Sequence, residues 1–515
     1  MSEFEKGEIL KADVSQRELR SGRYRILTMG LALPAILLSA ALLRRAWLDI
    51  DTAWDSIAYH MPFAALRAGI LSPSEYQINP AFDSYYTGFP VLPDYLQGWL
   101  WRLTSHAAAT NLVALLALAA LVAFLWRVWG VPLPDSLLSL LAIPVVLIDS
   151  TSSYIDLFAN CALSIVLLLV FLALVFPSRL KVRHLLGALA AMAVAANSKT
   201  PFVVLATAGV VILGGVMYLN RRQLAPLRGE FSRAPRFLQI AYVTCMLLLL
   251  GLSYCRYFEN FRQFGNPLYP VALKVGPIKL PGFLDSGGTR PEYLRGAPKV
   301  VVWALSVVEY NAFDGRVPFW TNGQGDLKLS SPAFRMGGYF GEYVLMNVFW
   351  LLFQQFRLRR TLGWKPLAFL ATLTVITALL PASHELRYYS YWMLCLVAVN
   401  LILIVNGLEG DDRFQTRLFF LAGAVAALAF CVLSDGGYYL RRTGAQPDLL
   451  VEGLGIKKSL SDMHLRQDEV VCVSGKGQFT FLYSPAFNPG LSSKTHYGVA
   501  QRDRPEECGN LRIAP

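Results

Sequence analysis

Apolar stretches long enough to cross a lipid bilayer recur along the whole chain. A spanning helix needs about 20 mostly apolar residues, and fewer where aromatic or basic side chains anchor its ends. The stretches that meet this requirement predict eleven transmembrane helices, at 26–43, 109–128, 136–150, 157–176, 185–198, 201–219, 238–254, 339–356, 366–381, 389–408 and 418–434. The predicted fold is therefore an all-α polytopic membrane protein.

The composition agrees with this prediction. Of the 515 residues, 55% are hydrophobic and only 16% are charged, whereas a soluble protein carries about 25% charged residues. The first apolar stretch follows a long polar segment and lacks a small-x-small cleavage site. It is therefore expected to be a retained span rather than a cleaved signal peptide.

Basic residues in the short connections predict the orientation in the membrane. The connections 177–184, 220–237 and 357–365 are rich in arginine and lysine, as is the segment before the first span. Short cytoplasmic loops carry such an excess, so the N-terminus is expected in the cytoplasm. The net charge of +12 then reflects orientation and lipid contact. No zinc-ligand spacing, Walker loop or basic-aromatic stripe points to nucleic acid.

Three longer segments then share the external face: a first loop at 44–108, a large loop at 255–338 and a C-terminal tail at 435–515. We expect residues 1–434 to form the membrane module and the tail to form a small α/β or β-rich domain. Within the tail, residues 468–485 alternate like two strands around a turn that contains glycine. Cys472 and Cys508 can form a disulfide if this end faces an oxidising compartment, although sequence alone leaves the pairing open.

The segment "DTAWDSIAYH" (51–60) places polar groups at the edge of the first span. Charged groups are costly in hydrocarbon, so the segment is expected in headgroups or in a wet cavity. Asp55 precedes a short amphipathic pattern that predicts an interfacial helix, and its carboxylate can serve as the N-cap of that helix. Alternatively, Asp55 is a general base, with Tyr59 on the same helical face and His60 adjacent. Asp51 is the competing candidate in this loop.

The weaker carboxylates of the first loop are Asp83 and Asp94, within an aromatic and proline-rich stretch that is typical of an interfacial belt. Asp156, in "SSYIDLFAN", opens the fourth span on the external face; it is either a helix N-terminal carboxylate or a group that holds a metal or a substrate hydroxyl. Lys199, in "ANSKTPF", lies in an external turn. It either snorkels to the interface or meets an anion there.

A late external turn, "PASHELRYYSYW" (381–392), adds further polar groups. The guanidinium of Arg387 suits a phosphate, and His384 and Tyr388 stand close to it in the sequence. The simpler interpretation is a surface pair between Arg387 and Glu385. The segment "FRQFGNPLYP" is a shaped turn, and its residue types imply no catalytic side chain.

Five motifs, in this order, resemble those of the GT-C superfamily of integral-membrane glycosyltransferases. The likeness is strongest to bacterial members similar to protein O-mannosyltransferases and aminoarabinose transferases. The motifs are "WDSIAYHMP", "SYIDLFAN", "NSKTPF", "FGNPLYP" and "ELRYYSYW". One position departs from the mannosyltransferase pattern, because Ser56 stands where a second acid often follows the aspartate. The subfamily and any bound metal therefore stay open.

The resemblance implies an inverting hexosyl- or pentosyltransferase of the cell envelope, in the bacterial inner membrane. Its donor would be a sugar on a polyprenyl phosphate such as undecaprenyl phosphate, and its acceptor a glycan, a lipid or a protein. Asp55 corresponds to the catalytic base and Asp156 to the second acidic position. Lys199, Arg387 and His384 would lie near the donor phosphate, with Tyr59, His60 and Tyr388 lining the cavity.

Two alternative functions remain from the sequence. A lipid or solute transporter also needs many spans, but usually shows paired halves and mid-membrane charges. Here the charges gather at one interface, and no internal repeat stands out. A lipid-linked glycan polymerase or ligase would also act on the external face, and it typically depends on arginine and histidine rather than on an acidic motif.

Overall fold

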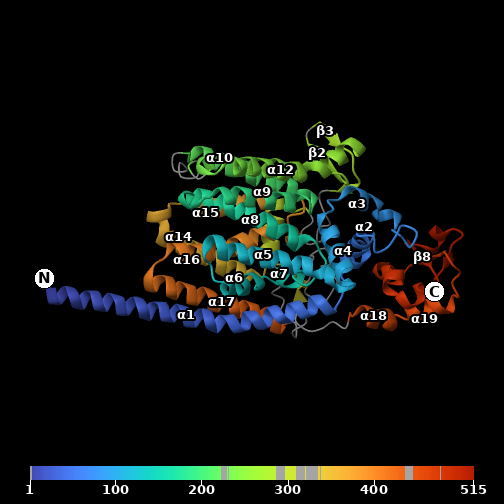
Figure 1. Cartoon of the computed structure of the whole chain (residues 1–515), viewed down its shortest axis with the longest axis horizontal. Helices are drawn as coiled ribbons and strands as arrows, with labels where there is room; N and C mark the ends of the chain where they lie inside the picture. Colours follow the sequence, from blue (N-terminus) through green and yellow to red (C-terminus); the bar gives the residue numbers. More distant parts are fainter. Residues whose placement is uncertain are drawn as a thin grey trace.

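Long helices form most of the molecule, and a small α/β domain lies at one end of the bundle (Figure 1). The computed structural model describes residues 3–221, 229, 231–275, 277–285, 296–308, 319–320, 335–336, 338–434, 445–475 and 477–514. The residues after the last span, 435–444, where the membrane module was expected to end, lie outside the described residues.

Each of the predicted apolar stretches coincides with a helix, which confirms the predicted fold class. The helices are α1 (Glu3–Leu48), α5 (Leu112–Trp129), α6 (Leu133–Leu141), α7 (Pro144–Asp149), α8 (Asp156–Val175), α9 (Val182–Ala196), α10 (Thr200–Leu219), α12 (Arg236–Phe264), α14 (Gly341–Leu362), α15 (Lys365–Leu379), α16 (Tyr391–Gly407) and α17 (Gly410–Ser434). The third stretch is broken, because Pro144 has no backbone N–H to continue α6 and instead opens α7.

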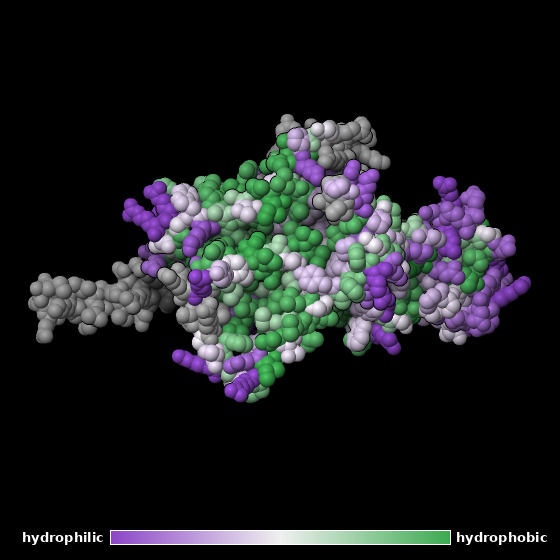
Figure 2. Space-filling model, turned by 90° about the horizontal axis from the view of Figure 1, so that it is seen from above, coloured by the Kyte–Doolittle hydropathy of each residue, from purple (hydrophilic) through white to green (hydrophobic). Residues whose placement is uncertain are grey.

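Six helices in the described part of the chain are long and apolar enough to cross a membrane: Gly22–Leu48, Ala107–Trp129, Asp156–Val175, Thr200–Leu219, Arg236–Phe264 and Gly410–Leu433. Hydrophobic residues cover the middle of the molecule, and hydrophilic residues gather at its two ends (Figure 2). At the centre of the bundle, α8 and α16 pack against each other and are buried along most of their length. This pattern is typical of a polytopic membrane protein.

The segment between α1 and α5 folds into short elements that pack on one another. They are a π-helical turn η1 (Ser56–His60), α2 (Met61–Arg67), β1 (Tyr76–Gln77), η2 (Pro80–Phe82), α3 (Asp83–Gly88), α4 (Leu92–Thr104) and η3 (Ala107–Asn111). A Cβ atom at Gly98 of α4 would lie only 2.2 Å from the carbonyl oxygen of Ala64 in α2, so glycine permits this close packing. The expected interfacial helix is therefore wrong, because α2 is buried between α4 and the C-terminal domain.

Helix α12 continues to Phe264, past residue 255, where the large segment was predicted to begin. Gly265 ends α12 with φ +68°, a conformation that favours glycine. The described parts of the segment are β2 (Val271–Val275), β3 (Ile278–Leu280) and β4 (Leu284–Asp285) in one sheet, α13 (Lys299–Val308), and the pair β5 (Phe319–Trp320) and β6 (Arg335–Met336). Asn266 shapes the first turn by donating to the carbonyl oxygens of Val271 and Pro281.

The C-terminal domain is built on a parallel sheet in the order β1-β8-β7-β9. Its elements are α18 (Pro447–Gly453), α19 (Ile456–Asp462), β7 (Glu469–Ser474), η9 (Gly477–Tyr483), η10 (Pro485–Phe487), α20 (Pro489–Ser492), β8 (Tyr497–Arg502), η11 (Pro505–Cys508) and β9 (Arg512–Ile513). The predicted hairpin over 468–485 is wrong. Its second half forms η9, whose aromatic residues fill the core, and β7 pairs instead with the later β8.

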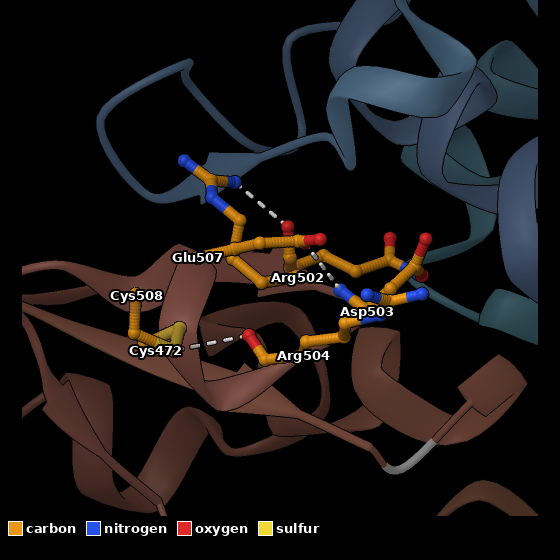
Figure 3. The surroundings of a disulfide bond; sticks show 7 residues. Cys472, Arg502, Asp503, Arg504, Glu507 and Cys508 are labelled. Atoms are coloured by element: carbon orange, nitrogen blue, oxygen red, sulfur yellow. Dashed lines mark hydrogen bonds between the residues drawn. A yellow bond between two sulfur atoms is a disulfide. The ribbon is translucent and has the colours of Figure 1, made fainter.

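Two features tie this domain together and to the rest of the molecule. A disulfide joins Cys472 of β7 to Cys508 of η11 (Figure 3). Strand β1 belongs to the segment between α1 and α5, and its Tyr76 lies opposite Val499 of β8. The Tyr76 hydroxyl also donates to Gln501, at 2.8 Å. The domain therefore packs directly on the segment that carries Asp55.

Candidate functional site

An ion pair between distant parts of the chain defines the candidate site. Asp55 directly precedes η1, and Arg387 lies in the short helix η8 (Leu386–Tyr389) between α15 and α16. Nη1 of Arg387 is 3.1 Å from Oδ2 of Asp55, and the two side chains are only 12% and 18% exposed. The Asp55 side chain makes no N-cap hydrogen bond, so the capping interpretation is wrong. A single π-helical turn such as η1 often occurs at functional sites.

A second ion pair lies beside the first. Asp156, at the start of α8 and 2% exposed, pairs with Nζ of Lys199, which precedes α10 and is 23% exposed. Arg387 bridges the two pairs, because its Nη1 also lies 4.0 Å from Oδ2 of Asp156. Four charged side chains from four separate segments thus form one group, here called the ion-pair cluster: Asp55, Asp156, Lys199 and Arg387.

Aromatic rings cover the cations of the ion-pair cluster. Nζ of Lys199 lies 3.6 Å from the centre of the Tyr388 ring, and Arg387 lies 4.9 Å from the same ring and 4.8 Å from that of Tyr154. The Tyr388 hydroxyl accepts a hydrogen bond from Nη2 of Arg387, at 3.2 Å. Such contacts hold the cations at fixed positions and shield them from water. Glu385 is buried, so the predicted surface location of an Arg387–Glu385 pair is wrong.

The charge of Arg387 is strongly favoured in this environment. Burial alone would lower its pKa, but Tyr388 and the carboxylates of Asp55 and Asp156 raise that pKa well above its ordinary value. For Tyr59, in contrast, the neutral form is favoured. Burial, together with the negative charge of Asp55, raises the pKa of Tyr59 well above its ordinary value. Tyr59 therefore stays a neutral phenol that can donate a hydrogen bond but cannot act as a base.

The other predicted residues occupy the surroundings of the cluster. Tyr59 packs in an aromatic group with Trp54 and Phe82. Asp51 accepts hydrogen bonds from the hydroxyls of Ser56 and Ser152, which join the first segment to the turn before α8. With both bonds on one oxygen, Asp51 acts as a structural anchor here.

His60 lies close to Asp94, with 3.6 Å between Nδ1 and Oδ1, and its ring also neighbours those of Tyr59 and Tyr154. Asp94 is buried and also binds Nε of Arg67 at 3.2 Å, so these groups brace α2 against α4. Asp83 is exposed at the start of α3. His384 is buried in the turn before η8. Arg387 and Lys199 make the ion pairs that define the cluster.

Asn160 is a residue of the site that the sequence reading missed. Its Nδ2 donates to the carbonyl oxygens of Asp156, at 2.8 Å, and of Arg387, at 3.0 Å, and its Oδ1 accepts from the Tyr391 backbone N–H at 2.8 Å. This one amide therefore holds η8 against the first turn of α8. An asparagine one helical turn after a carboxylate, inside an apolar span, was the available signal.

Asp149, at the end of α7, is the second omission. It is buried, and its Oδ1 has no hydrogen-bond partner among the described residues. Asp156, Arg387, Asp51 and Lys199 all act on it electrostatically. Nothing in its local sequence, "VVLIDSTS", distinguishes it from an ordinary helix end. Within the described residues, no three histidine, cysteine, aspartate or glutamate side chains gather in a way that could hold a metal ion.

The cluster can bind an anion and accept a proton in one place. In the ligand-free protein each cation is neutralised by a carboxylate, so an incoming phosphate must compete with Asp55 and Asp156 for Arg387 and Lys199. A guanidinium and an ammonium at fixed positions suit phosphate oxygens. A carboxylate released from its guanidinium partner is a stronger proton acceptor than a paired one.

No family model matches the chain, and no curated protein matches it in sequence. Among solved structures, the chain is similar to ArnT from Cupriavidus metallidurans in the apo state. That comparison has a TM-score of 0.49 and 11% sequence identity, and it covers 93% of this chain and 90% of that chain. At this level of identity the likeness carries no statement about chemistry.

Proposed function

We propose that the chain is a membrane glycosyltransferase that moves a sugar from a polyprenyl phosphate to an acceptor on the external face. The single observation that carries this proposal is the contact of Asp55 with Arg387, beside the pair of Asp156 and Lys199. A proton acceptor and two fixed cations thereby meet at one end of the bundle. The motif resemblance assigns the same residues to the base and the phosphate site, which supports the proposal independently.

In the proposed reaction, Asp55 removes the proton from an acceptor hydroxyl or amine as that atom attacks the anomeric carbon. The new glycosidic bond forms as the bond from the anomeric carbon to the phosphate oxygen breaks. The configuration inverts, and the polyprenyl phosphate leaves with the electron pair. Negative charge grows on the phosphate, so Arg387 and Lys199 stabilise the transition state more than the bound donor.

Donor binding and base activation are coupled in this scheme. Arg387 exchanges its contact with Asp55 for the donor phosphate, and this exchange frees the Asp55 carboxylate. Asp156 is almost fully buried and stays with Lys199, which keeps the ammonium at the phosphate position. Tyr59, a neutral phenol, can donate a hydrogen bond within the same site.

The proposed location is the inner membrane of a bacterium, with the N-terminus in the cytoplasm and the C-terminal domain outside. The basic short connections support this orientation. The Cys472–Cys508 disulfide also supports it, because disulfides persist mainly in oxidising compartments. The acceptor is a glycan, a lipid or a protein that reaches the external segments.

The test uses purified full-length protein in nanodiscs, with a polyprenyl-phosphate sugar and an acceptor pool from the cell envelope. Asp55→Asn keeps the size of the side chain and removes its basicity. We expect a loss of about 1,000-fold in turnover, within the usual range for general-base catalysis. Asp83→Asn is the matched control, because Asp83 is an exposed carboxylate of the same segment. Near-normal turnover by a folded Asp55→Asn variant would rule out the proposed base.

A further inference from the structure

A second basic site lies at the membrane edge opposite the ion-pair cluster. A cavity of about 610 Å³ is lined by Tyr24, Arg25, Thr28, Pro132, Val405, Arg413 and Arg417. These residues come from α1, the segment before α6, and the facing ends of α16 and α17. At a helical rise of about 1.5 Å per residue, Thr28 lies roughly 30 Å along α1 from Leu48. Asp55 follows shortly after Leu48 in the sequence, so the cavity and the Asp55 site lie toward opposite ends of α1.

A buried ion pair holds the wall of this cavity in place. Arg417, 3% exposed, donates from Nε to Oδ2 of Asp135 at 2.6 Å and from Nη2 to Oδ1 at 2.9 Å. Its Nη2 also donates to the hydroxyl of Thr28 in α1, at 2.7 Å. Arg417 therefore links α17, α6 and α1, and its charge is matched by Asp135.

Two polar groups in the same wall have no hydrogen-bond partner among the described residues. Nε of Arg413 and the hydroxyl of Tyr24 are buried and make no hydrogen bond to any described residue. Arg413 lies 5.5 Å from the centre of the Tyr24 ring, so both groups face one small region. Buried donors without hydrogen-bond partners are unfavourable, and a ligand with acceptor oxygens in the cavity would supply the missing hydrogen bonds.

The charges around the cavity favour an anion. Arg25, Arg413 and Arg417 line it. Among the described acids near these arginines, Asp135 is paired with Arg417 and Asp412 with Arg357, whereas Glu409 and Asp411 are exposed. Planar guanidinium groups bind phosphate oxygens in pairs. An oxyanion with several acceptor oxygens thus fits the lining better than a neutral molecule.

The position of the cavity selects the source of that anion. The apolar spans Gly22–Leu48 and Gly410–Leu433 begin at this level, so the cavity lies at headgroup depth. Ile26, Met29 and Phe419 are more than half exposed next to it, as expected of lipid-facing side chains. We propose that this cavity binds the phosphate of an anionic phospholipid headgroup, in the leaflet opposite the Asp55 site. Basic pockets between transmembrane helices commonly take such headgroups.

The test measures lipid binding by the delipidated full-length protein in detergent, with short-chain phosphatidylglycerol and phosphatidylcholine as probes. We expect preference for phosphatidylglycerol, and a loss of about tenfold in its affinity for Arg413→Gln. Arg25→Gln is a second variant that should fold normally, because Arg25 is exposed. It should weaken binding several-fold at an unchanged melting temperature. Arg360→Gln is the matched control, an exposed arginine at the end of α14 that does not line the cavity.

Tyr24→Phe separates binding from structure. The Tyr24 hydroxyl bonds to no described residue, so this variant should keep the melting temperature and still bind phosphatidylglycerol less tightly. An equal loss for Arg360→Gln and Arg413→Gln would reduce the effect to general surface charge and overturn the proposal. Equal binding of both lipids, or displacement of phosphatidylglycerol by inorganic phosphate at comparable concentration, would overturn it as well. The outcome does not depend on the chemistry proposed at Asp55.

Discussion

Nη1 of Arg387 lies 3.1 Å from Oδ2 of Asp55, although Asp55 directly precedes η1 and Arg387 lies between α15 and α16. The same nitrogen is 4.0 Å from Asp156. One guanidinium thus joins two acidic motifs that are far apart in the sequence. Any anion that binds Arg387 must change the partners of at least one of these carboxylates.

Replacing Arg387 by lysine should therefore cost activity even though the charge is kept. An ammonium lacks the planar fork that can contact Asp156 and a phosphate together. We expect Arg387→Lys to lower kcat by about 100-fold, the usual effect of losing one electrostatic partner of the transition state. Steady-state kinetics with a polyprenyl-phosphate sugar would measure this. Arg360→Lys should be neutral, and a fully active Arg387→Lys enzyme would contradict a bidentate role.

The pair of Asp156 and Lys199 should be needed for stability as well as for activity. Asp156 is 2% exposed, so Lys199→Met would leave a buried carboxylate without its main partner. Loss of one partner from a buried pair typically costs about 3 to 5 kcal/mol of unfolding free energy. Adding Asp156→Asn to Lys199→Met should restore most of that stability but should not restore sugar transfer. Thermal unfolding in detergent would measure the stability of both variants. If the double variant were as unstable as Lys199→Met, the pair would not be the cause.

The sequence predicted the helices well, because hydrophobic length alone specifies them. It also brought forward Asp55, Asp156, Lys199, Arg387 and Tyr388, which the structure places together, although their catalytic roles stay predictions. Two expectations about local form were wrong for a common reason. The amphipathic pattern after Asp55 and the alternation over 468–485 describe which side chains are apolar, and both segments are buried by tertiary packing that a local pattern cannot show.

The sequence analysis did not identify the polar site residues that lie inside apolar stretches. Asn160 and Asp149 occur one at a time among hydrophobic neighbours, and their importance depends on which turn faces them across the bundle. The sequence alone does not show that the backbone of Arg387 meets α8 at Asn160. Such long-range contacts decide the site, whereas the helices follow from local composition.

Asp149→Asn should stabilise the protein. Asp149 is buried, one of its oxygens has no described hydrogen-bond partner, and the carboxylates of Asp156 and Asp51 repel it. Replacing this buried carboxyl group by a neutral amide should raise the free energy of unfolding by about 1 kcal/mol. Thermal unfolding of the purified protein would measure the change, with Asp94→Asn as the contrast. Asp94 is paired with Arg67, so its removal should destabilise. A less stable Asp149→Asn variant would show that Asp149 has a partner that contributes to the fold.

Breaking the disulfide should impair transfer through the segment that carries Asp55. Cys472 and Cys508 close a loop of 36 positions, and loss of such a bond typically costs about 3 to 4 kcal/mol. Because β1 pairs with β8, a loosened sheet would release the segment between α1 and α5 and lower kcat. Turnover and limited proteolysis of Cys508→Ser would test this, in a background where the exposed thiols of Cys245 and Cys255 are replaced by serine. Unchanged turnover alongside faster proteolysis of the domain would show that the domain does not position Asp55.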